Sequence, residues 1–272
     1  MGSVFSPYYA RARRRGDADP ENHCALNVAL YGDGWERWSM TERGRRWIKR
    51  EPTHFSIGPS AMCWEDGALV IDIDEVTVPI PTRLRGKVRL TPSAICAHEV
   101  RLDPQGLHVW RPVAPFSRIE VALERPELHW SGIGYHDSNW GVVPLEDSFE
   151  SWVWSRAAMK DGAAIVYDTV LRDGGTSAFA LRIGSDGNVT DMPLPPRRDM
   201  PTTFWRMARH MRSERPFETV SLLEDSPFYA RTLLKVETEE GKADAFHESL
   251  SLKRFRNPVV QMMLPFRMPR RG

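Results

Sequence analysis

Hydrophobic and polar residues alternate with a period of two along most of this chain, as they do in strands that bury one face of a sheet. Pairs such as Asp66-Gly67 and Glu240-Gly241 separate these stretches and are typical of tight turns. Long helical patterns are scarce, and short helices are predicted only near residues 8–15 and 258–264. Strands are predicted over residues 23–31, 68–78, 86–90, 107–113, 117–123, 163–171, 176–183, 217–223, 230–236 and 245–252.

Many strands at hairpin spacing indicate an all-β protein built as an antiparallel sandwich or barrel. The polar, proline-containing segment Leu123-Glu-Arg-Pro-Glu127 separates two sets of predicted strands. A boundary there gives two β units, residues 1–125 and 126–272, each of normal domain size. Because neither half clearly repeats the sequence of the other, one large sheet system is the alternative.

Composition limits the partners and the compartment that can be expected. The 37 Lys and Arg residues balance 36 Asp and Glu residues, so the net charge of +1 gives no reason to expect a nucleic-acid partner. Three distant cysteines, Cys24, Cys63 and Cys96, fit a reducing compartment such as the cytoplasm. The N-terminus reaches arginine and proline too early for a signal peptide, and no apolar run approaches the ~20 residues of a membrane-spanning helix.

Basic residues gather at the two ends of the chain and leave two interpretations open. Arginines cluster over residues 11–15 and 267–271, and the second cluster adjoins the apolar, methionine-rich stretch 259–268. One interpretation is peripheral contact with an anionic membrane surface, with 259–268 as a lipid-facing lip. The other is two solvated ends, with 259–268 closing the end of a barrel.

Motifs that mark common cofactor and nucleophile chemistries are absent from the sequence. It contains no P-loop, no third glycine after Gly132-Ile-Gly134 to complete a dinucleotide fingerprint, no H-E-x-x-H, no compact Cys/His cluster and no G-x-S-x-G elbow. A mechanism that uses no metal or redox cofactor is therefore the simplest expectation.

Residues 130–141, Trp-Ser-Gly-Ile-Gly-Tyr-His-Asp-Ser-Asn-Trp-Gly, combine aromatic, polar and glycine residues with almost no aliphatic ones. Tyr135 and Asp137 are two apart, so in an extended chain they share a face, as do His108 and Trp110. If both strands line one cavity, an acid, a phenol, an indole and an imidazole converge. Aromatic surroundings raise the pKa of a carboxyl group and stabilise a nearby cation, which indicates acid chemistry on an apolar substrate with Asp137 as the acid.

A structural alternative exists for this group of residues. In that case Trp110 and Tyr135 are core residues, and Asp137 caps a turn through backbone N–H groups, since Asp beside Gly and Asn is common in turns. Asp72 and Asp74 also share a strand face and could act as the paired carboxylates of a glycan-active enzyme. An alternating acidic face is, however, more typical of the solvated side of a sheet.

Several segments, spread in order over nearly the whole chain, match one known family. They include Gly2-Ser-Val-Phe-Ser-Pro-Tyr-Tyr9, Ala25-Leu-Asn-Val-Ala-Leu-Tyr31, His108-Val-Trp-Arg-Pro112, residues 130–141, Pro227-Phe-Tyr-Ala-Arg231 and His247-Glu-Ser-Leu-Ser251. In these segments the chain resembles the carotenoid 1,2-hydratases, also called hydroxyneurosporene synthases. The resemblance implies two lipocalin-like β units and the addition of water across the C1–C2 double bond of an acyclic carotenoid such as neurosporene or lycopene.

Site residues are also implied by the resemblance. The family's functional positions map onto His108, Trp110, Tyr135 and Asp137, each with the residue type retained. Asp137 would protonate the alkene, Trp110 and Tyr135 would face the resulting cation, and water would then attack. His108 is expected to take up the released proton or to orient Asp137. Trp130 and Trp140, which are outside the mapped positions, are expected to form a substrate-binding wall or to be packing residues. No metal or redox cofactor is implied, since hydration changes no net oxidation state.

An aromatic cavity of this kind also suits a non-catalytic, lipocalin-like protein that binds carotenoids or other lipids, and a working proton donor distinguishes the enzyme from such a binder. Family members usually carry more sequence, including an aromatic-rich first strand, before the segment that starts here at Gly2. An exposed sheet edge is therefore expected in the first β unit.

Overall fold

The computed structural model describes residues 2–32 and 36–272, which form two compact units. Unit 1 comprises Met1–Pro92, Arg118–Gly134 and Gln261–Gly272, and unit 2 comprises Ser93–Ser117 and Tyr135–Val260. Two long strands, β9 (His108–Arg125) and β10 (Glu127–Gly141), contribute residues to both units. The boundary predicted between residues 125 and 126 falls in the turn between these strands.

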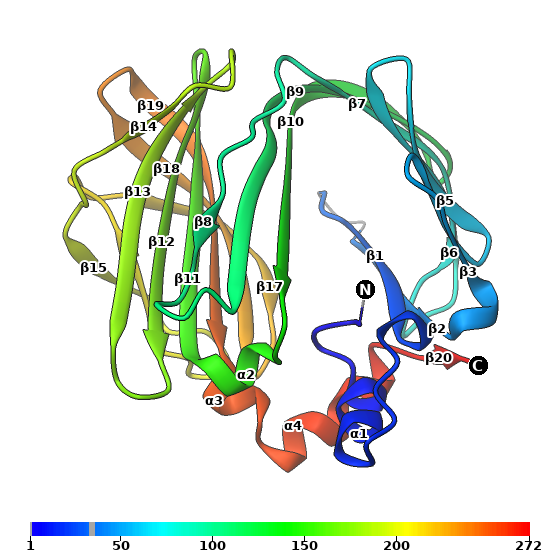
Figure 1. Ribbon diagram of the computed structural model, residues 1–272. Coiled ribbons are helices and arrows are strands. Elements are labelled where there is room, and N and C mark those ends of the chain that lie inside the picture. Colours follow the sequence, from blue (N-terminus) through cyan, green and yellow to red (C-terminus); the bar gives the residue numbers. More distant parts are fainter. Residues whose placement is uncertain (1, 33–35) are drawn as a thin grey trace. The chain divides into compact units, whose positions relative to one another are not determined.

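Unit 1 is built on two sheets (Figure 1). The smaller sheet has the order β1-β2-β20, and the larger has the order β10-β9-β7-β6-β5-β4-β3. The remaining strands are β1 (Cys24–Leu30), β2 (Arg37–Arg43), β3 (Ile48–Arg50), β4 (His54–Ile57), β5 (Ser60–Glu65), β6 (Ala68–Val76), β7 (Arg83–Pro92) and β20 (Arg270–Arg271).

The core of unit 1 lies between these two sheets. Ile73, Leu84 and Leu123 of the larger sheet are almost fully buried, and Val28 and Leu30 of β1 pack against the cluster that they form. Alternate positions of each strand point to opposite faces, so the period-two pattern of the sequence becomes one buried and one solvated face.

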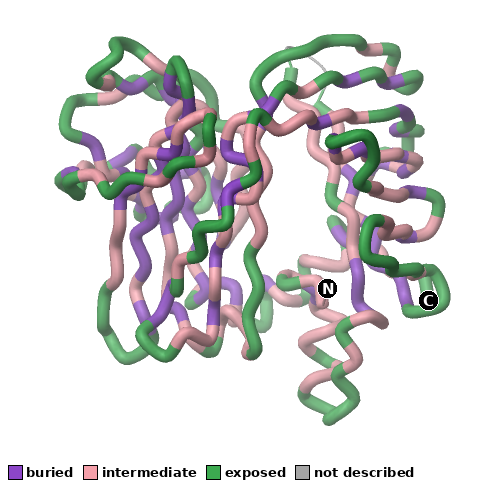
Figure 2. Tube along the Cα trace, turned by 45° about the horizontal axis from the view of Figure 1, so that its top comes forward, coloured by how far each residue is buried: buried purple, intermediate pink, exposed green. Residues whose placement is uncertain are grey.

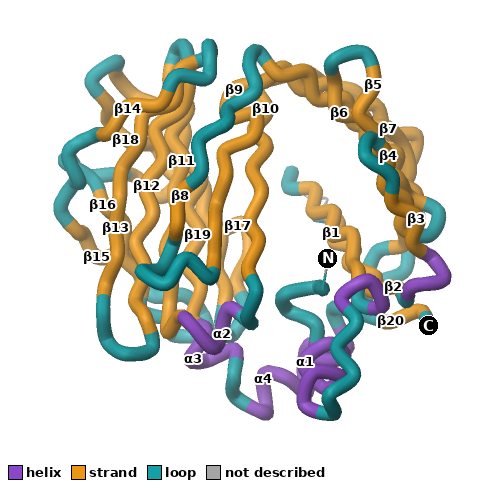
Figure 3. The backbone as a smooth tube through the Cα atoms, in the orientation of Figure 1, coloured by secondary structure: helices purple, strands orange, loops and turns teal. Residues whose placement is uncertain are grey.

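Helices are short in both units, as the sequence predicts (Figure 3). Ser6 begins the first of them, because its Oγ accepts a hydrogen bond from the backbone N–H of Tyr9 at 2.9 Å. Among the residues that the structure describes, no helix has the length and apolar character needed to cross a membrane. The helical elements are α1 (Pro7–Arg14), η1 (Pro20–Asn22), η2 (Arg45–Trp47), α2 (Leu145–Ser148), α3 (Leu252–Phe255), α4 (Pro258–Met263) and η3 (Leu264–Phe266).

Unit 2 is dominated by a seven-stranded antiparallel sheet with the order β14-β13-β12-β11-β19-β18-β17, and buried positions run along its strands (Figure 2). Unit 2 also contains a two-stranded ribbon, β15-β16, the short β8, which pairs with β9, and the parts of β9 and β10 that belong to it. Its strands are β8 (Val100–Arg101), β11 (Phe149–Met159), β12 (Gly162–Leu171), β13 (Thr176–Gly184), β14 (Val189–Asp191), β15 (Arg197–Met200), β16 (Arg209–Arg212), β17 (Glu218–Asp225), β18 (Tyr229–Thr238) and β19 (Gly241–Ser251).

The two faces of the seven-stranded sheet differ in character. One face packs on the β15-β16 ribbon through a cluster that includes Met200, Met211 and Leu234. The other face presents aromatic residues, among them Trp154 and Tyr167, which lie opposite each other on β11 and β12. The all-β, antiparallel prediction is therefore confirmed, and none of the sheets among the described residues closes into a barrel.

A buried carboxylate fastens the ribbon to the sheet. Asp168 of β12 is 1% exposed at its side chain and accepts hydrogen bonds from Arg197 at 2.6 Å and from Arg212 at 2.7 Å, with His210 Nε2 at 3.2 Å. Burial opposes the charge of Asp168, but the bonds from His210, Arg197 and Arg212 outweigh it and hold the pKa of the carboxyl well below its usual value. A carboxyl with a lowered pKa stabilises the fold at neutral pH and loses that contribution as the pH falls into the acidic range.

We expect Asp168→Asn to lower the free energy of unfolding by about 3 kcal/mol, because it leaves two guanidinium groups without their counter-charge. Chemical denaturation at neutral pH measures the change. Asp161→Asn is the matched control, since Asp161 pairs with Arg182 but is 67% exposed, and a loss below about 1 kcal/mol is expected there. Equal losses in the two variants would contradict the role given to Asp168.

A candidate acid site in unit 2

Three of the predicted site residues meet within unit 2. The indole Nε1 of Trp110 donates a hydrogen bond to Oδ2 of Asp137 at 2.7 Å, and the hydroxyl of Tyr135 donates to the same oxygen at 2.9 Å. Tyr135 and Asp137 share a face of β10 because they are two residues apart in an extended strand. The interpretation of Asp137 as a turn cap is wrong, because residues 127–141 form a strand and the carboxyl group is bonded by side chains.

Both hydrogen bonds fall on one oxygen, which distinguishes the two oxygens of the carboxyl group. Oδ2 acts as the acceptor, so a proton on Asp137 belongs on Oδ1. Burial raises the pKa of Asp137, the bonds from Trp110 and Tyr135 partly offset that rise, and the charge of Glu248 adds to it. The site therefore holds the pKa of Asp137 above its ordinary value, and Oδ1 is the oxygen that the indole and phenol leave free.

Aromatic rings surround this acid. Trp110 is fully buried, with its ring centroid 5.3 Å from that of Tyr167 and 5.8 Å from that of Phe179. Tyr167 stacks on Phe179 at 5.3 Å and meets Trp152 edge-on at 6.1 Å. Electron-rich ring faces stabilise a cation.

A buried arginine lies beside Tyr135. The guanidinium carbon of Arg156 is 5.0 Å from the centroid of the Tyr135 ring, and the ring of Trp154 is 5.6 Å from it. Burial lowers the pKa of Arg156. Burial and the charge of Asp137 raise the pKa of Tyr135 well above 10, so Tyr135 remains a neutral donor.

His108 is buried in unit 2 but faces a different partner. Its Nε2 lies 3.0 Å from Oγ of Ser148, its ring packs on Phe149 at 5.0 Å, and burial lowers its pKa. Among the described residues, no hydrogen bond joins His108 to Asp137. A Cβ on Gly141 would lie 2.3 Å from Nδ1 of His108, so glycine at 141 is what lets the ring approach β10.

The two tryptophans at the ends of residues 130–141, Trp130 and Trp140, are more exposed. Trp140 belongs to unit 2 and is 44% exposed, and its position three residues from Asp137 puts it on the other face of β10. Trp130 belongs to unit 1 and is 47% exposed. Their substrate-binding role stays a prediction.

Four residues near the acid were not singled out from the sequence: Trp154, Arg156, Tyr167 and Glu248. Trp154 and Arg156 come from β11, for which no strand was predicted. The sequence Trp152-Val-Trp-Ser-Arg156 does alternate, placing two indoles and a guanidinium on one face. Such an unusual inward face is the signal that could have found them, although only the register of β11 against β19 places Trp154 opposite Glu248.

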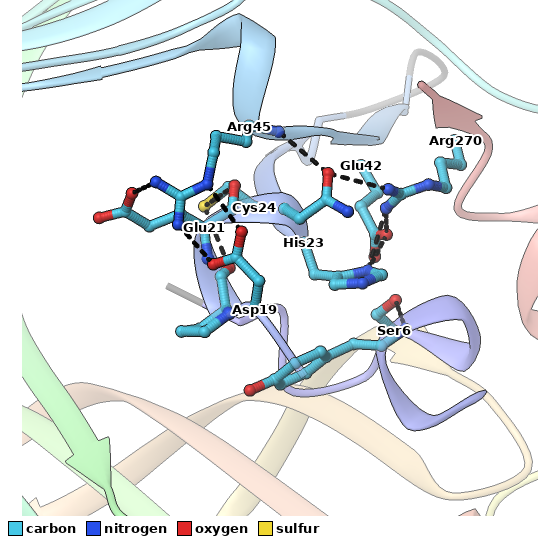
Figure 4. Close-up of polar contacts among 11 residues, drawn as sticks. Ser6, Asp19, Glu21, His23, Cys24, Glu42, Arg45 and Arg270 are labelled. Atoms are coloured by element: carbon cyan, nitrogen blue, oxygen red, sulfur yellow. Dashed lines mark hydrogen bonds and ion pairs between the residues drawn. The ribbon is translucent and has the colours of Figure 1, made fainter. Parts of the chain in front are cut away.

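Unit 1 contains a second polar cluster, shown in Figure 4, which connects distant parts of the chain. Nδ1 of His23 lies 2.8 Å from Oε1 of the buried Glu42, and Arg270 near the C-terminus pairs with the same carboxylate. Arg45 donates to Asp19 at 2.7 Å. We interpret this cluster as structural, because its ion pairs connect segments near both ends of the chain to β2 and to the η2 turn that follows it.

Asp72 and Asp74 of unit 1 do not form a free pair of carboxylates. Lys87 contacts Asp72 at 2.6 Å, and Arg83 of the same neighbouring strand pairs with Asp74. These contacts run across the solvated side of β6 and β7, which favours the structural interpretation of the acidic face.

Comparison with known proteins adds family information to this geometry. The family model described as "Carotenoid hydratase CrtC" matches residues 1–272. An acyclic carotenoid 1,2-hydratase of Thiocapsa roseopersicina is 54% identical over 275 residues, which cover 100% of this chain and 68% of the relative. Proteins with the same name from Rubrivivax gelatinosus and Cereibacter sphaeroides are 48% and 40% identical, each over 100% of this chain and over 68% and 96% of their own lengths.

One solved structure supports the fold. The crystal structure of an AttH candidate from Nitrosomonas europaea superimposes with a TM-score of 0.62, covering 85% of this chain and 81% of that one, at 15% sequence identity. At this identity the likeness shows the fold alone, and it agrees with the lipocalin-like, all-β architecture predicted from the sequence.

We expect Tyr135→Phe to raise the pKa of Asp137, because the phenol bond to Oδ2 stabilises the ionised form. Carbon-13 NMR of labelled aspartate carboxyl groups, followed over pH, measures this shift. Tyr167→Phe is the matched control, since the Tyr167 hydroxyl faces Asn139 at 3.4 Å and makes no bond to Asp137. An unchanged or lowered pKa in Tyr135→Phe would contradict the account of the site.

Proposed function

The chain belongs to the carotenoid hydratase family, and on that premise we propose that it adds water across the C1–C2 double bond of an acyclic carotenoid such as neurosporene or lycopene. The observation that carries this proposal is the carboxyl group of Asp137, bonded at one oxygen by Trp110 and Tyr135 and enclosed by aromatic rings. The product is a tertiary alcohol.

Protonation is the difficult step, because an isolated trisubstituted alkene is a very weak base. Asp137 transfers the proton from Oδ1 to C2, which leaves a tertiary cation at C1. As the proton departs, negative charge develops on the carboxyl group, and the hydrogen bonds from Trp110 and Tyr135 become charge-assisted and stronger. Bonds that strengthen only as the reaction proceeds lower the barrier rather than merely binding substrate.

The rings stabilise the cation. A cation over an aromatic face gains about 2 kcal/mol or more in a desolvated site, which is roughly thirtyfold in rate if it acts only in the transition state. The candidate rings are those of Trp110 and Tyr135, which bond to Asp137, and that of Tyr167, which packs on Trp110 at 5.3 Å.

Water then attacks C1 and loses a proton. We assign that proton to the carboxylate of Asp137, which restores the acid for the next turnover. His108 is a weaker candidate for this step, since its Nε2 lies against Ser148 and its pKa is lowered by burial. Its proposed part is to shape the wall of the site with Phe149.

The apolar substrate must reach the protein from a lipid phase, and we propose that the C-terminal segment meets the membrane surface. Val259, Met262 and Phe266 in this segment are 59%, 65% and 79% exposed, and the basic Arg267 follows them. Exposed apolar side chains beside arginine suit insertion at the headgroup level of an anionic membrane.

Asp137→Asn removes the proton donor at nearly constant volume and should lower hydration by a factor on the order of 10² to 10⁴. Expression in lycopene-producing cells, followed by chromatography of the pigments, measures hydroxylated product. Asp161→Asn is the control and should match the unaltered protein. Full turnover by Asp137→Asn would refute the proposed acid, and bound carotenoid without product in the unaltered protein would favour a non-catalytic binder.

The activity should also fall as the pH rises above the raised pKa of Asp137, because only the neutral carboxyl group can donate a proton. The rate of hydration by purified protein over pH, with a parallel check that the fold persists, measures this alkaline limb. A rate that rises through the same range would contradict the assignment of Asp137 as the acid.

A further inference from the structure

Two buried side chains beside the acid carry N–H groups that lack acceptors. Arg156 is 7% exposed, and its Nε and Nη2 have no hydrogen-bond partner among the described residues. Trp154 is 9% exposed, and its Nε1 is likewise without an acceptor in the part of the chain that the structure describes. Buried donors in native proteins are nearly always paired, so donors left open indicate a place for an acceptor that the chain itself does not supply.

These donors share one location. Trp154 and Arg156 are two apart in β11, so they lie on the same face of the sheet. Both flank Tyr135, with the Trp154 ring at 5.6 Å and the Arg156 guanidinium at 5.0 Å from its ring centroid. The hydroxyl of Tyr135 in turn bonds to Asp137, so the open donors border the site of proton transfer.

The carboxylate that lies opposite Trp154 on this face is already engaged. Glu248 lies opposite Trp154 in the register of β11 and β19, but its Oε1 accepts two bonds from Arg231, at 2.7 and 2.9 Å. No ion pair joins Arg156 to a carboxylate in the part of the chain that the structure describes, and its guanidinium group lies against the face of the Tyr135 ring. A fixed positive charge opposes formation of a carbocation nearby, so a buried arginine in this site calls for a function that offsets its cost.

We propose that Arg156, with Trp154 as a second donor, binds the oxygen atom that the reaction adds to C1: water before the addition, and the tertiary hydroxyl group after it. This inference rests on the proposed function and names a positioning residue for the step in which water attacks the cation. An N–H donor occupies one lone pair of the water and leaves the other lone pair for C1. In a site otherwise lined by rings, holding the water in place replaces a chance encounter with an oriented one.

The proposed step balances in atoms and electrons. A lone pair of the bound water forms the C1–O bond and fills the empty orbital of the cation. One O–H bond of the attached water then breaks, its electron pair stays on oxygen, and the proton passes to the carboxylate of Asp137. Arg156 donates hydrogen bonds throughout and transfers no proton.

Partition of the cation tests this assignment. In D2O, Asp137 delivers deuterium to C2, and the cation is either captured by water or loses a proton to give back an alkene that carries deuterium. Arg156→Met should impair only capture, so hydration should fall on the order of tenfold or more while deuterium continues to enter the recovered carotenoid. Mass spectrometry measures the ratio of deuterated alkene to alcohol, and this ratio should rise by the same factor.

Three further variants sharpen the comparison. Arg156→Lys retains a cationic donor and should restore part of the capture, and Arg156→Leu, which also lacks a donor, makes the same test if Arg156→Met does not fold. Arg182→Met is the matched control at an exposed ion pair and should leave the ratio unchanged. Circular dichroism and carotenoid absorption on binding check that each variant is folded and loaded.

Two results would overturn the inference: hydration that stays unchanged in Arg156→Met, or hydration and deuterium exchange that fall by the same factor, as a merely structural role predicts. Failure of the proposed function has a different signature. If the unaltered protein forms no alcohol and exchanges no deuterium, there is no cation to capture, and the inference falls with the function on which it rests.

Discussion

The paired hydrogen bonds onto Oδ2 of Asp137 are the constraint on which the site depends. A carboxyl group in an aromatic setting keeps its proton more readily, but without fixed partners its two oxygens would be equivalent and its orientation free. Trp110 and Tyr135 remove that freedom and define which oxygen holds the proton. In the proposed reaction the same two donors stabilise the carboxylate as it forms, and preorganised donors of this kind lower a barrier.

The fold of unit 2 supports this arrangement by giving its large sheet two different faces. One face is held by apolar packing and by the ion pairs of Asp168 with Arg197 and Arg212. The other face supplies the rings that surround the acid and the donors that border it. Along β11 the order is Phe149 and Trp152 first, then Trp154 and Arg156, so the surroundings change from aromatic to polar along one strand. In the proposed reaction the rings stabilise the cation and Arg156 binds the water, in the same order along the strand.

Much of the fold and part of the site could be predicted from the sequence. β18 alternates clearly between buried and more exposed positions, because one of its faces packs against an apolar layer. Asp137, Tyr135 and Trp110 could be grouped because spacing by two residues places side chains on one face, and here the structure brings the two pairs of positions to the same sheet. The position of His108 beside Ser148 could not be read from spacing, since it depends on how α2 follows β10.

β11 was missed for a physical reason. Its residues are covered on both faces, and the inward face carries indoles and a guanidinium instead of aliphatic side chains, so the usual alternation is hidden. Long-range register, which sets Trp154 opposite Glu248 and brings Arg156 to Tyr135, is likewise not encoded in any local pattern. Each unit is built from segments that are separate in the sequence, and a single predicted boundary cannot describe such units.

Neutron diffraction from a deuterium-exchanged crystal, collected near the pH of maximum activity, tests the central claim most directly. The account predicts deuterium on Oδ1 of Asp137, with the indole and phenol deuterons of Trp110 and Tyr135 both directed at Oδ2. An ionised carboxylate at that pH, or a deuteron on Oδ2, would contradict it.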